Sequence, residues 1–157
     1  MKTINSNMTI LHLPNKFLLQ KTETVTKVDR SIRDLAHKMI KIKNEGEAVG
    51  LAANQIGVDK RLCVIGFKPK DKKEAVIPEI TLINPVITWR SKEQVSEDER
   101  CLSVDKDSVN VPRAKKIHVQ YLDLDGKKQK LKARGLLARI IQHELDHLDG
   151  KTIADYK

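Results

Sequence analysis

Apolar residues along the chain recur with two different periods, and each period predicts a different kind of element. In the segment 29–46 they recur three and four positions apart, which predicts an amphipathic helix. Either Asp29 or Ser31 is a suitable N-cap for this helix, and Gly46 marks its end. The segment 136–147 has the same helical spacing and predicts a second helix near the end of the chain.

Between the two predicted helices, short runs of apolar and β-branched residues predict strands. A hairpin turn is expected at Asp125-Gly126, and the lysine-rich segment 68–74 is expected to be an exposed turn. An extended segment or strand at 9–13 is closed by Pro14-Asn15. The predicted strands are 61–67, 79–89, 109–112, 116–124 and 129–133. One helix, several strands and a final helix favour an α+β domain.

Length and composition narrow the class of protein. With 157 residues, of which 39% are hydrophobic and 32% charged, we expect a single domain over 1–157. No apolar run approaches the roughly 20 residues that span a bilayer, and residues 1–7 lack the apolar core of a signal peptide. We therefore expect a cytoplasmic monomer with reduced cysteines and no membrane partner.

The formal net charge of +9 indicates attraction to polyanions such as nucleic acid. Basic residues cluster at 68–73 and 127–132, but aromatic residues make up only 3% of the chain and do not alternate with them. This pattern favours a solvated basic surface over a nucleic-acid footprint.

The two cysteines have different surroundings. Cys63 lies in an apolar run that is typical of a buried strand, whereas Cys101 lies in a polar stretch, where a thiol more often has a chemical role. A third feature is the run of small residues from Ala48 to Gln55, which lets the backbone approach a neighbour closely.

The segment His143-Glu144-Leu145-Asp146-His147 carries the strongest chemical signal. Residues four apart face the same way on a helix, so His143 and His147 can bind one metal ion beside Glu144. The alternative is a pair of helix histidines without a metal. A catalytic metal usually takes three protein ligands, and neither His nor Glu follows His147. Cys101 is the best upstream candidate, because thiolate is a strong ligand for borderline metals.

Three segments, in this order along the chain, resemble the three motifs of peptide deformylases: 50–55 (Gly-Leu-Ala-Ala-Asn-Gln), 99–103 (Glu-Arg-Cys-Leu-Ser) and 142–147 (Gln-His-Glu-Leu-Asp-His). Shorter segments at 11–14, 83–85, 111–114 and 125–126 are also similar to that family, so the resemblance covers nearly the whole chain. It implies hydrolytic removal of the formyl group from the N-terminal formyl-methionine of nascent polypeptides. The fold we expect has antiparallel β-sheets around a central metal-binding helix, plus the N-terminal helix.

The resemblance also implies a role for each matching residue. Cys101, His143 and His147 would hold one divalent ion, Fe(II) as a rule, with Zn, Ni or Co as alternatives. A metal-bound water would attack the formyl carbon, with Glu144 as general base and then acid. The Gln55 side chain and the Leu102 backbone N–H would donate to the oxyanion, and backbone near Gly50 would pair with the substrate as an added strand. The implied substrate-binding residues are Val49, Gly50, Glu99, Arg100, Leu136, Arg139, Ile140 and His143.

Several positions depart from the family pattern or leave two interpretations. Ala48 and Arg100 stand where the family usually has glycine, and we expect Arg100 to point outward and shape the rim of the substrate groove. Glu97 and Arg139 stand where it generally has apolar residues near the pocket for the methionine side chain, and their opposite charges predict an ion pair. Glu99 either orients a metal ligand or is a plain surface carboxylate.

The chain ends soon after the second predicted helix, whereas bacterial deformylases commonly carry a further C-terminal helix used at the ribosome. A short viral or phage copy, acting in the host cytoplasm, is one explanation. Ribosome docking is then weak, although the positive charge leaves an attraction to ribosomal RNA. Two other functions stay open at this point: a small metalloprotease, and a basic RNA-binding module with an incidental metal site.

Overall fold

The computed structural model describes residues 8–74 and 76–157, so the N-terminal residues on which the expectation of a missing signal peptide rests lie outside the described residues. Two α-helices are present in this part of the chain, α1 (Arg30–Glu45) and α2 (Gly135–Leu148), and both lie within one or two residues of the predicted segments. The Asp29 side chain accepts from the Ile32 backbone N–H at 3.2 Å, so Asp29 rather than Ser31 is the N-cap of α1.

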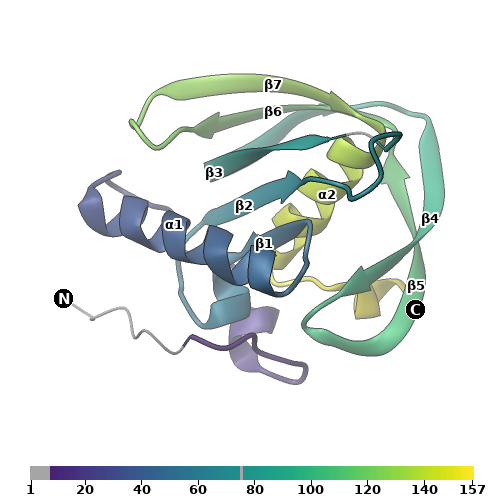
Figure 1. Ribbon diagram of the computed structural model, residues 1–157, viewed down its shortest axis with the longest axis horizontal. Coiled ribbons are helices and arrows are strands. Elements are labelled where there is room, and N and C mark those ends of the chain that lie inside the picture. Colours follow the sequence, from purple (N-terminus) through teal and green to yellow (C-terminus); the bar gives the residue numbers. More distant parts are fainter. Residues whose placement is uncertain (1–7, 75) are drawn as a thin grey trace.

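A five-stranded antiparallel sheet and a two-stranded sheet surround α2 (Figure 1). The larger sheet has the order β1-β2-β3-β6-β7, and the smaller one pairs β4 with β5. The strands are β1 (Gly50–Ala52), β2 (Leu62–Phe67), β3 (Ile77–Arg90), β4 (Gln94–Cys101), β5 (Val104–Ala114), β6 (Lys116–Leu122) and β7 (Lys128–Arg134). This arrangement confirms the predicted α+β fold with antiparallel sheets around a central helix.

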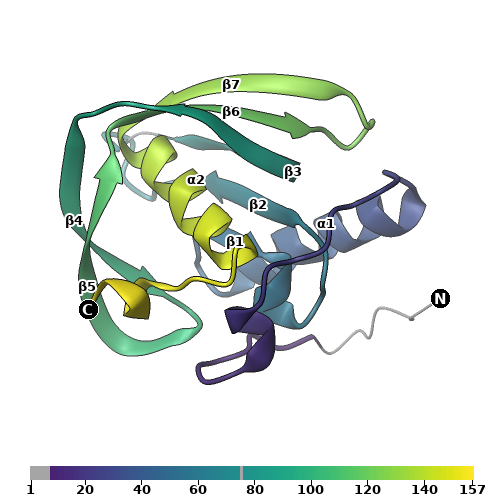
Figure 2. The same ribbon diagram turned by 180° about the vertical axis from the view of Figure 1, so that it is seen from behind.

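Hydrophobic burial explains why the helices lie on opposite faces of the larger sheet. Helix α2 packs its apolar side, including Ile141 and Leu145, against Ile65 and Val119 on one face. Helix α1 covers the other face at the β1–β2 end, where its buried residues contact side chains such as Leu62 and Val64. Figure 2 shows α2 running through the middle of the molecule, with β4 and β5 on its remaining side.

Strand β4 was not predicted from the sequence. Its burial pattern shows why, because only Glu99 is buried while most other positions are exposed, so the strand has no apolar alternation. It is held by pairing with β5 from Gln94 opposite Ala114 to Cys101 opposite Val104. Cys63 is fully buried in β2, as predicted, whereas Cys101 at the end of β4 is only half-buried.

The connecting segments follow the sequence expectations with one refinement. The segment before Pro14 is extended but belongs to neither sheet, and the Leu11 and Leu13 N–H groups donate to Gln55 O and Ser103 O. Short 3-10 helices follow at Lys16–Leu19, Ala53–Ile56 and Ile153–Tyr156. Within the described ranges, no helix is long and apolar enough to cross a membrane.

Candidate active site

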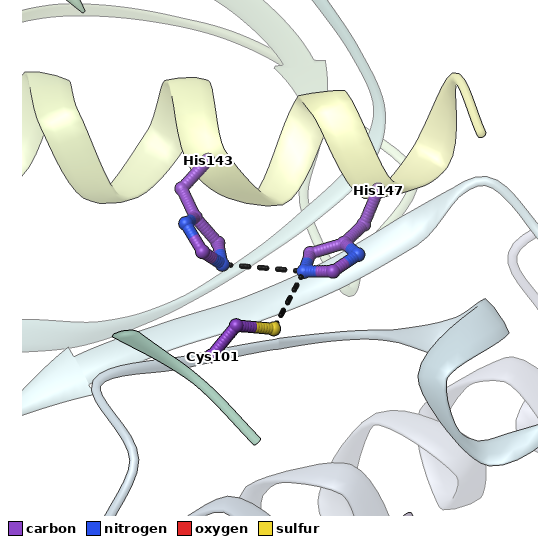
Figure 3. Close-up of side chains that lie close together, drawn as sticks. All are labelled: Cys101, His143 and His147. Carbon is purple, nitrogen blue, oxygen red and sulfur yellow. Dashed lines mark hydrogen bonds between the residues drawn. The ribbon is translucent and has the colours of Figure 1, made fainter. Parts of the chain in front are cut away.

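The end of β4 meets the central helix at a cluster of one thiol and two imidazoles. His143 and His147 lie one turn apart on α2, and their Nε2 atoms are 3.2 Å from each other. Cys101 Sγ lies 3.2 Å from His147 Nε2, and the ligand atoms of the three residues all fall within 4.8 Å (Figure 3). The structure thus brings together the three residues that the sequence singled out.

This cluster fits a divalent metal ion. Metal–nitrogen bonds of about 2.0–2.1 Å and metal–sulfur bonds of about 2.3 Å place neighbouring ligand atoms of a tetrahedral site roughly 3.3–3.6 Å apart. The 3.2 Å separations are close to that range. Three ligands leave a fourth position for water or substrate, which is the arrangement of catalytic rather than structural sites.

Glu99 orients one of the two imidazoles. Its Oε1 lies 2.8 Å from His143 Nδ1, and only 7% of the residue is exposed. Because a carboxylate can only accept, Nδ1–H donates, and in the neutral imidazole that binds a metal the Nε2 lone pair then faces the cluster. Burial raises the pKa of Glu99, but hydrogen bonds from His143 and Arg113 outweigh it and leave the pKa at about 2. Glu99 is thus buried against His143 and is not a plain surface carboxylate, which favours the interpretation that it orients a ligand.

Arg113 holds this carboxylate in place and was not recognised from the sequence. Its Nε and Nη2 donate to the two Glu99 oxygens at 3.0 and 2.9 Å, a bidentate geometry typical of strong ion pairs. Its Nη1 donates to Asp146, which also accepts from the Tyr156 hydroxyl at 2.7 Å. Asp146 consequently has a structural role. The only signal for Arg113 was its place in the segment 111–114.

Glu144 lies beside the cluster in a dry environment. Only 3% of the residue is exposed, and its Oε2 has no hydrogen-bond partner in the part of the chain that the structure describes. Burial raises the pKa of this carboxyl to about 7, and a cation at the neighbouring ligands would oppose that shift. A Cβ at Gly50 would come within 2.5 Å of Glu144 Oε1, so the close backbone approach predicted for the small-residue segment is present.

The side-chain amide of Gln55 also points at the cluster of Cys101, His143 and His147. Its Oε1 accepts from the Ala52 N–H at 2.9 Å, which fixes the amide so that Nε2 faces the cluster. Nε2 donates to Ser103 Oγ at 3.1 Å and lies 3.7 Å from Cys101 Sγ. Ser103, which is fully buried, is a second contact that was not recognised from the sequence.

A cavity of about 470 Å³ opens onto the cluster. His147 is 1% exposed and does not line it, so this imidazole lies behind the other two ligands. Arg100 lines the cavity and is exposed, in agreement with its predicted place on the rim. Ala48 is also in the wall. The remaining sequence-predicted residues that line it are Val49, Gly50, Gln55, Glu99, Cys101, Leu102, Leu136, Arg139, Ile140, His143 and Glu144.

The predicted ion pair between Glu97 and Arg139 is confirmed, with Arg139 Nε 3.3 Å from a Glu97 oxygen. Arg139 does more than the sequence indicated. It is buried, and its Nη1 donates to Glu99 Oε2 and to Val111 O, while Nη2 donates to Val95 O. One side chain of α2 thus fastens both β4 and β5 to the helix that carries the histidines.

We expect Arg139→Met to lower the free energy of unfolding by about 2–4 kcal/mol, because it leaves two backbone carbonyls and part of a buried carboxylate without their donors. Denaturant titration measures this loss. Arg30→Met is the matched control, since the Arg30 side chain is 91% exposed and its removal should change stability by less than about 0.5 kcal/mol. Equal stability of the two variants would show that this network does not hold the sheets to α2.

Comparisons with known proteins agree on one family. The sequence model of the family described as Polypeptide deformylase matches residues 7–157. A peptide deformylase from Nitrosococcus oceani is 44% identical over 149 residues, covering 95% of this chain and 86% of that protein. The crystal structure of peptide deformylase from Ehrlichia chaffeensis has a TM-score of 0.90 at 38% identity and covers 96% of this chain and 88% of that one. The Met-Ala-Ser-bound structure of a class I type b peptide deformylase from Acinetobacter baumannii has a TM-score of 0.90 at 28% identity, covering 96% and 98%.

Proposed function

The chain belongs to the polypeptide deformylase family, and on that basis we propose that Cys101, His143 and His147 are its metal ligands and Glu144 its general base. It is a metal-dependent hydrolase that removes N-formyl groups from nascent peptides. One observation carries the assignment of residues: the three ligand atoms lie within 4.8 Å of one another, and a buried carboxylate lies next to them.

Each polar group near the cluster then has a defined role in the reaction. A divalent ion at the ligands supplies Lewis acidity and lowers the pKa of water. Glu144 accepts a proton from the water that attacks the formyl carbon, and delivers it to the amine nitrogen as the C–N bond breaks. Formate and a free N-terminal amine result. The Gln55 Nε2 and the Leu102 backbone N–H donate to the oxygen on which negative charge develops.

The edge of the larger sheet offers a place for the peptide. Among the described residues, strand β1 pairs only with β2, and the Val49 carbonyl already accepts from the Gly66 N–H at 3.0 Å, so the backbone of Gly50 is the part that can pair with an extended substrate. Main-chain pairing of this kind tolerates many sequences. Leu136 and Ile140 supply an apolar wall of the cavity for the first side chain of the peptide, and Arg100 contacts residues further along it.

The metal, the setting and the partners are part of the same proposal. A thiolate with two imidazoles suits borderline divalent ions, and we take Fe(II) as the native ion, with Zn, Ni or Co as alternatives. We take the enzyme to act as a monomer. We place the enzyme in the cytoplasm, in the host cytoplasm if the gene is viral, where formylated nascent peptides are made and weak association with ribosomal RNA can occur.

An assay on paired peptides tests this function. The protein, purified without oxygen, should release formate from formyl-Met-Ala-Ser, and it should leave acetyl-Met-Ala-Ser nearly untouched, with about a hundredfold lower kcat/KM. The reason is steric, because the extra methyl group of the acetyl peptide crowds the carbon that water must reach. Metal analysis of the same sample identifies the ion.

The assay also separates the two other functions. A metalloprotease would cleave the internal Met–Ala bond in both peptides, and an RNA-binding module would hydrolyse neither. Either result would overturn the proposed function. The buried Glu144 beside the ligands argues against a module whose metal site has no catalytic role.

A further inference from the structure

The outer face of strands β3, β6 and β7 gathers basic and aromatic side chains far from the active site. Cross-strand neighbours in an antiparallel sheet point to the same face. Trp89 of β3 is the neighbour of His118 on β6, which in turn is the neighbour of Lys132 on β7. The next row along the sheet joins Val86, Gln120 and Lys130 in the same way.

Basic residues alternate along the edge strand. Lys128, Lys130, Lys132 and Arg134 occupy every second position of β7 and therefore share one face, while Leu131 and Ala133 between them pack towards α2. All four are exposed, and no ion pair or hydrogen bond of their side chains occurs within residues 8–74 and 76–157. At the hairpin, Asp123 already accepts from two backbone N–H groups and from Gln129.

Apolar surface is exposed among these cations. Trp89, the single tryptophan of the chain, is 46% exposed, and Val86 is 55% exposed. The centroids of the Trp89 and His118 rings lie 4.7 Å apart, so the indole contacts the imidazole and still leaves part of its surface to solvent. In both ribbon views no helix or strand of the described residues lies over β6 and β7 on the side away from α2 (Figures 1 and 2), and α1 packs at the β1–β2 end of the sheet.

We propose that this face binds single-stranded RNA, with a base stacked on Trp89 and phosphates paired with Lys130, Lys132 and Arg134. An exposed aromatic ring on an open sheet, bordered by unpaired cations, is the combination by which proteins hold single strands without reading sequence. RNA is the polyanion at hand where nascent peptides emerge. The sequence pattern hid this feature, because Trp89 and His118 are distant along the chain from the lysine cluster at 127–132. The proposal does not depend on the identity of the catalytic residues.

The single tryptophan makes a direct test. Titrating the full-length protein with a 12-nucleotide oligouridine at 50 mM salt should quench Trp89 fluorescence saturably. The logarithm of the binding constant should fall with the logarithm of salt concentration, with a slope of roughly −2 to −3.5, at about −0.7 per phosphate contacted. Absence of saturable quenching, or a slope near zero, would overturn the proposal.

Paired variants decide whether this face of the sheet or the net charge of the protein is responsible for RNA binding. Lys130→Gln with Lys132→Gln should weaken binding at least about fivefold and reduce the slope by about 1.4, while formate release stays at the wild-type rate. Lys68→Gln with Lys70→Gln removes the same charge from the exposed turn between β2 and β3. This pair should leave the binding of the oligouridine, its salt dependence and the rate of formate release unchanged. Equal weakening by the two pairs would overturn the proposal, as would tighter binding of phosphatidylglycerol vesicles than of the oligouridine at the same salt.

Discussion

Replacing Glu144 by glutamine is expected to lower kcat on formyl-Met-Ala-Ser by about a thousandfold while metal content stays at the wild-type level. General acid–base groups typically contribute about 10²–10⁴ in rate. Glutamine has nearly the same shape but cannot accept the proton of the attacking water. The ligands do not depend on this carboxylate, because His143 is oriented by Glu99 and not by Glu144. Formate release and metal analysis on one preparation measure both quantities.

The same variant separates a catalytic role from a structural one. Burial raises the pKa of Glu144 to about 7, so at pH 8 the folded protein holds a charge that the unfolded chain would hydrate at lower cost. A neutral amide removes that cost, and the metal-free Glu144→Gln protein should unfold at a temperature no lower than the wild type. Glu144→Asp is the companion variant. It keeps a carboxylate, but on a shorter side chain that lies farther from the reacting atoms, and it should retain intermediate activity. A kcat for Glu144→Gln above one tenth of wild type would rule out Glu144 as the base.

Sequence periodicity was enough to predict the elements that bury one apolar side. Helices α1 and α2 and strand β2 lie almost where the pattern placed them, because burial imposes the spacing from which the prediction was made. Strand β4 was not predicted, for the opposite reason. Its one buried side chain is a carboxylate, and its position is set by pairing with β5, which no local pattern reports.

The residues of the active site also fall into those that a local pattern predicts and those that depend on packing between elements. Helical spacing alone places His143 and His147 on one face, and the shortage of later ligands pointed to Cys101. The supporting contacts depend on how β4 and β5 dock against α2, which is a property of the folded chain. Arg113 and Ser103 were missed for that reason, as was Asn54, whose side chain donates to the His147 backbone carbonyl.

The docking of these elements also explains how Arg139 can stand where the family pattern has an apolar residue without disturbing the site. Its guanidinium finds acceptors on both β4 and β5, so the buried charge is matched by Glu97 and Glu99 and by two carbonyls. The opposite charges predicted the Glu97 contact. The link to Glu99 connects the cavity wall with the carboxylate that orients His143, and it could be seen only in the folded protein.

Removing the thiolate of Cys101 is expected to abolish activity by a different route, through loss of the metal. Cys101→Ala leaves two imidazoles, and since loss of a group that merely orients a ligand already weakens metal binding about 10–100-fold, loss of a ligand itself should weaken it by more than about a hundredfold. After gel filtration with a chelator, the variant should carry almost no metal and release almost no formate. Chelator competition gives the affinity directly.

Cys63 provides the matched control, because it is the other free thiol of the chain. It is fully buried in β2 and packs in the core cluster with α2, so Cys63→Ala removes a sulfur without touching a ligand. That variant should lose some stability, about 1 kcal/mol for a small cavity, and keep its metal and its kcat. If Cys101→Ala kept a full complement of tightly bound metal, the third ligand would have to be another residue. If that residue were Glu144, the assignment of the general base would be wrong as well as that of the ligand.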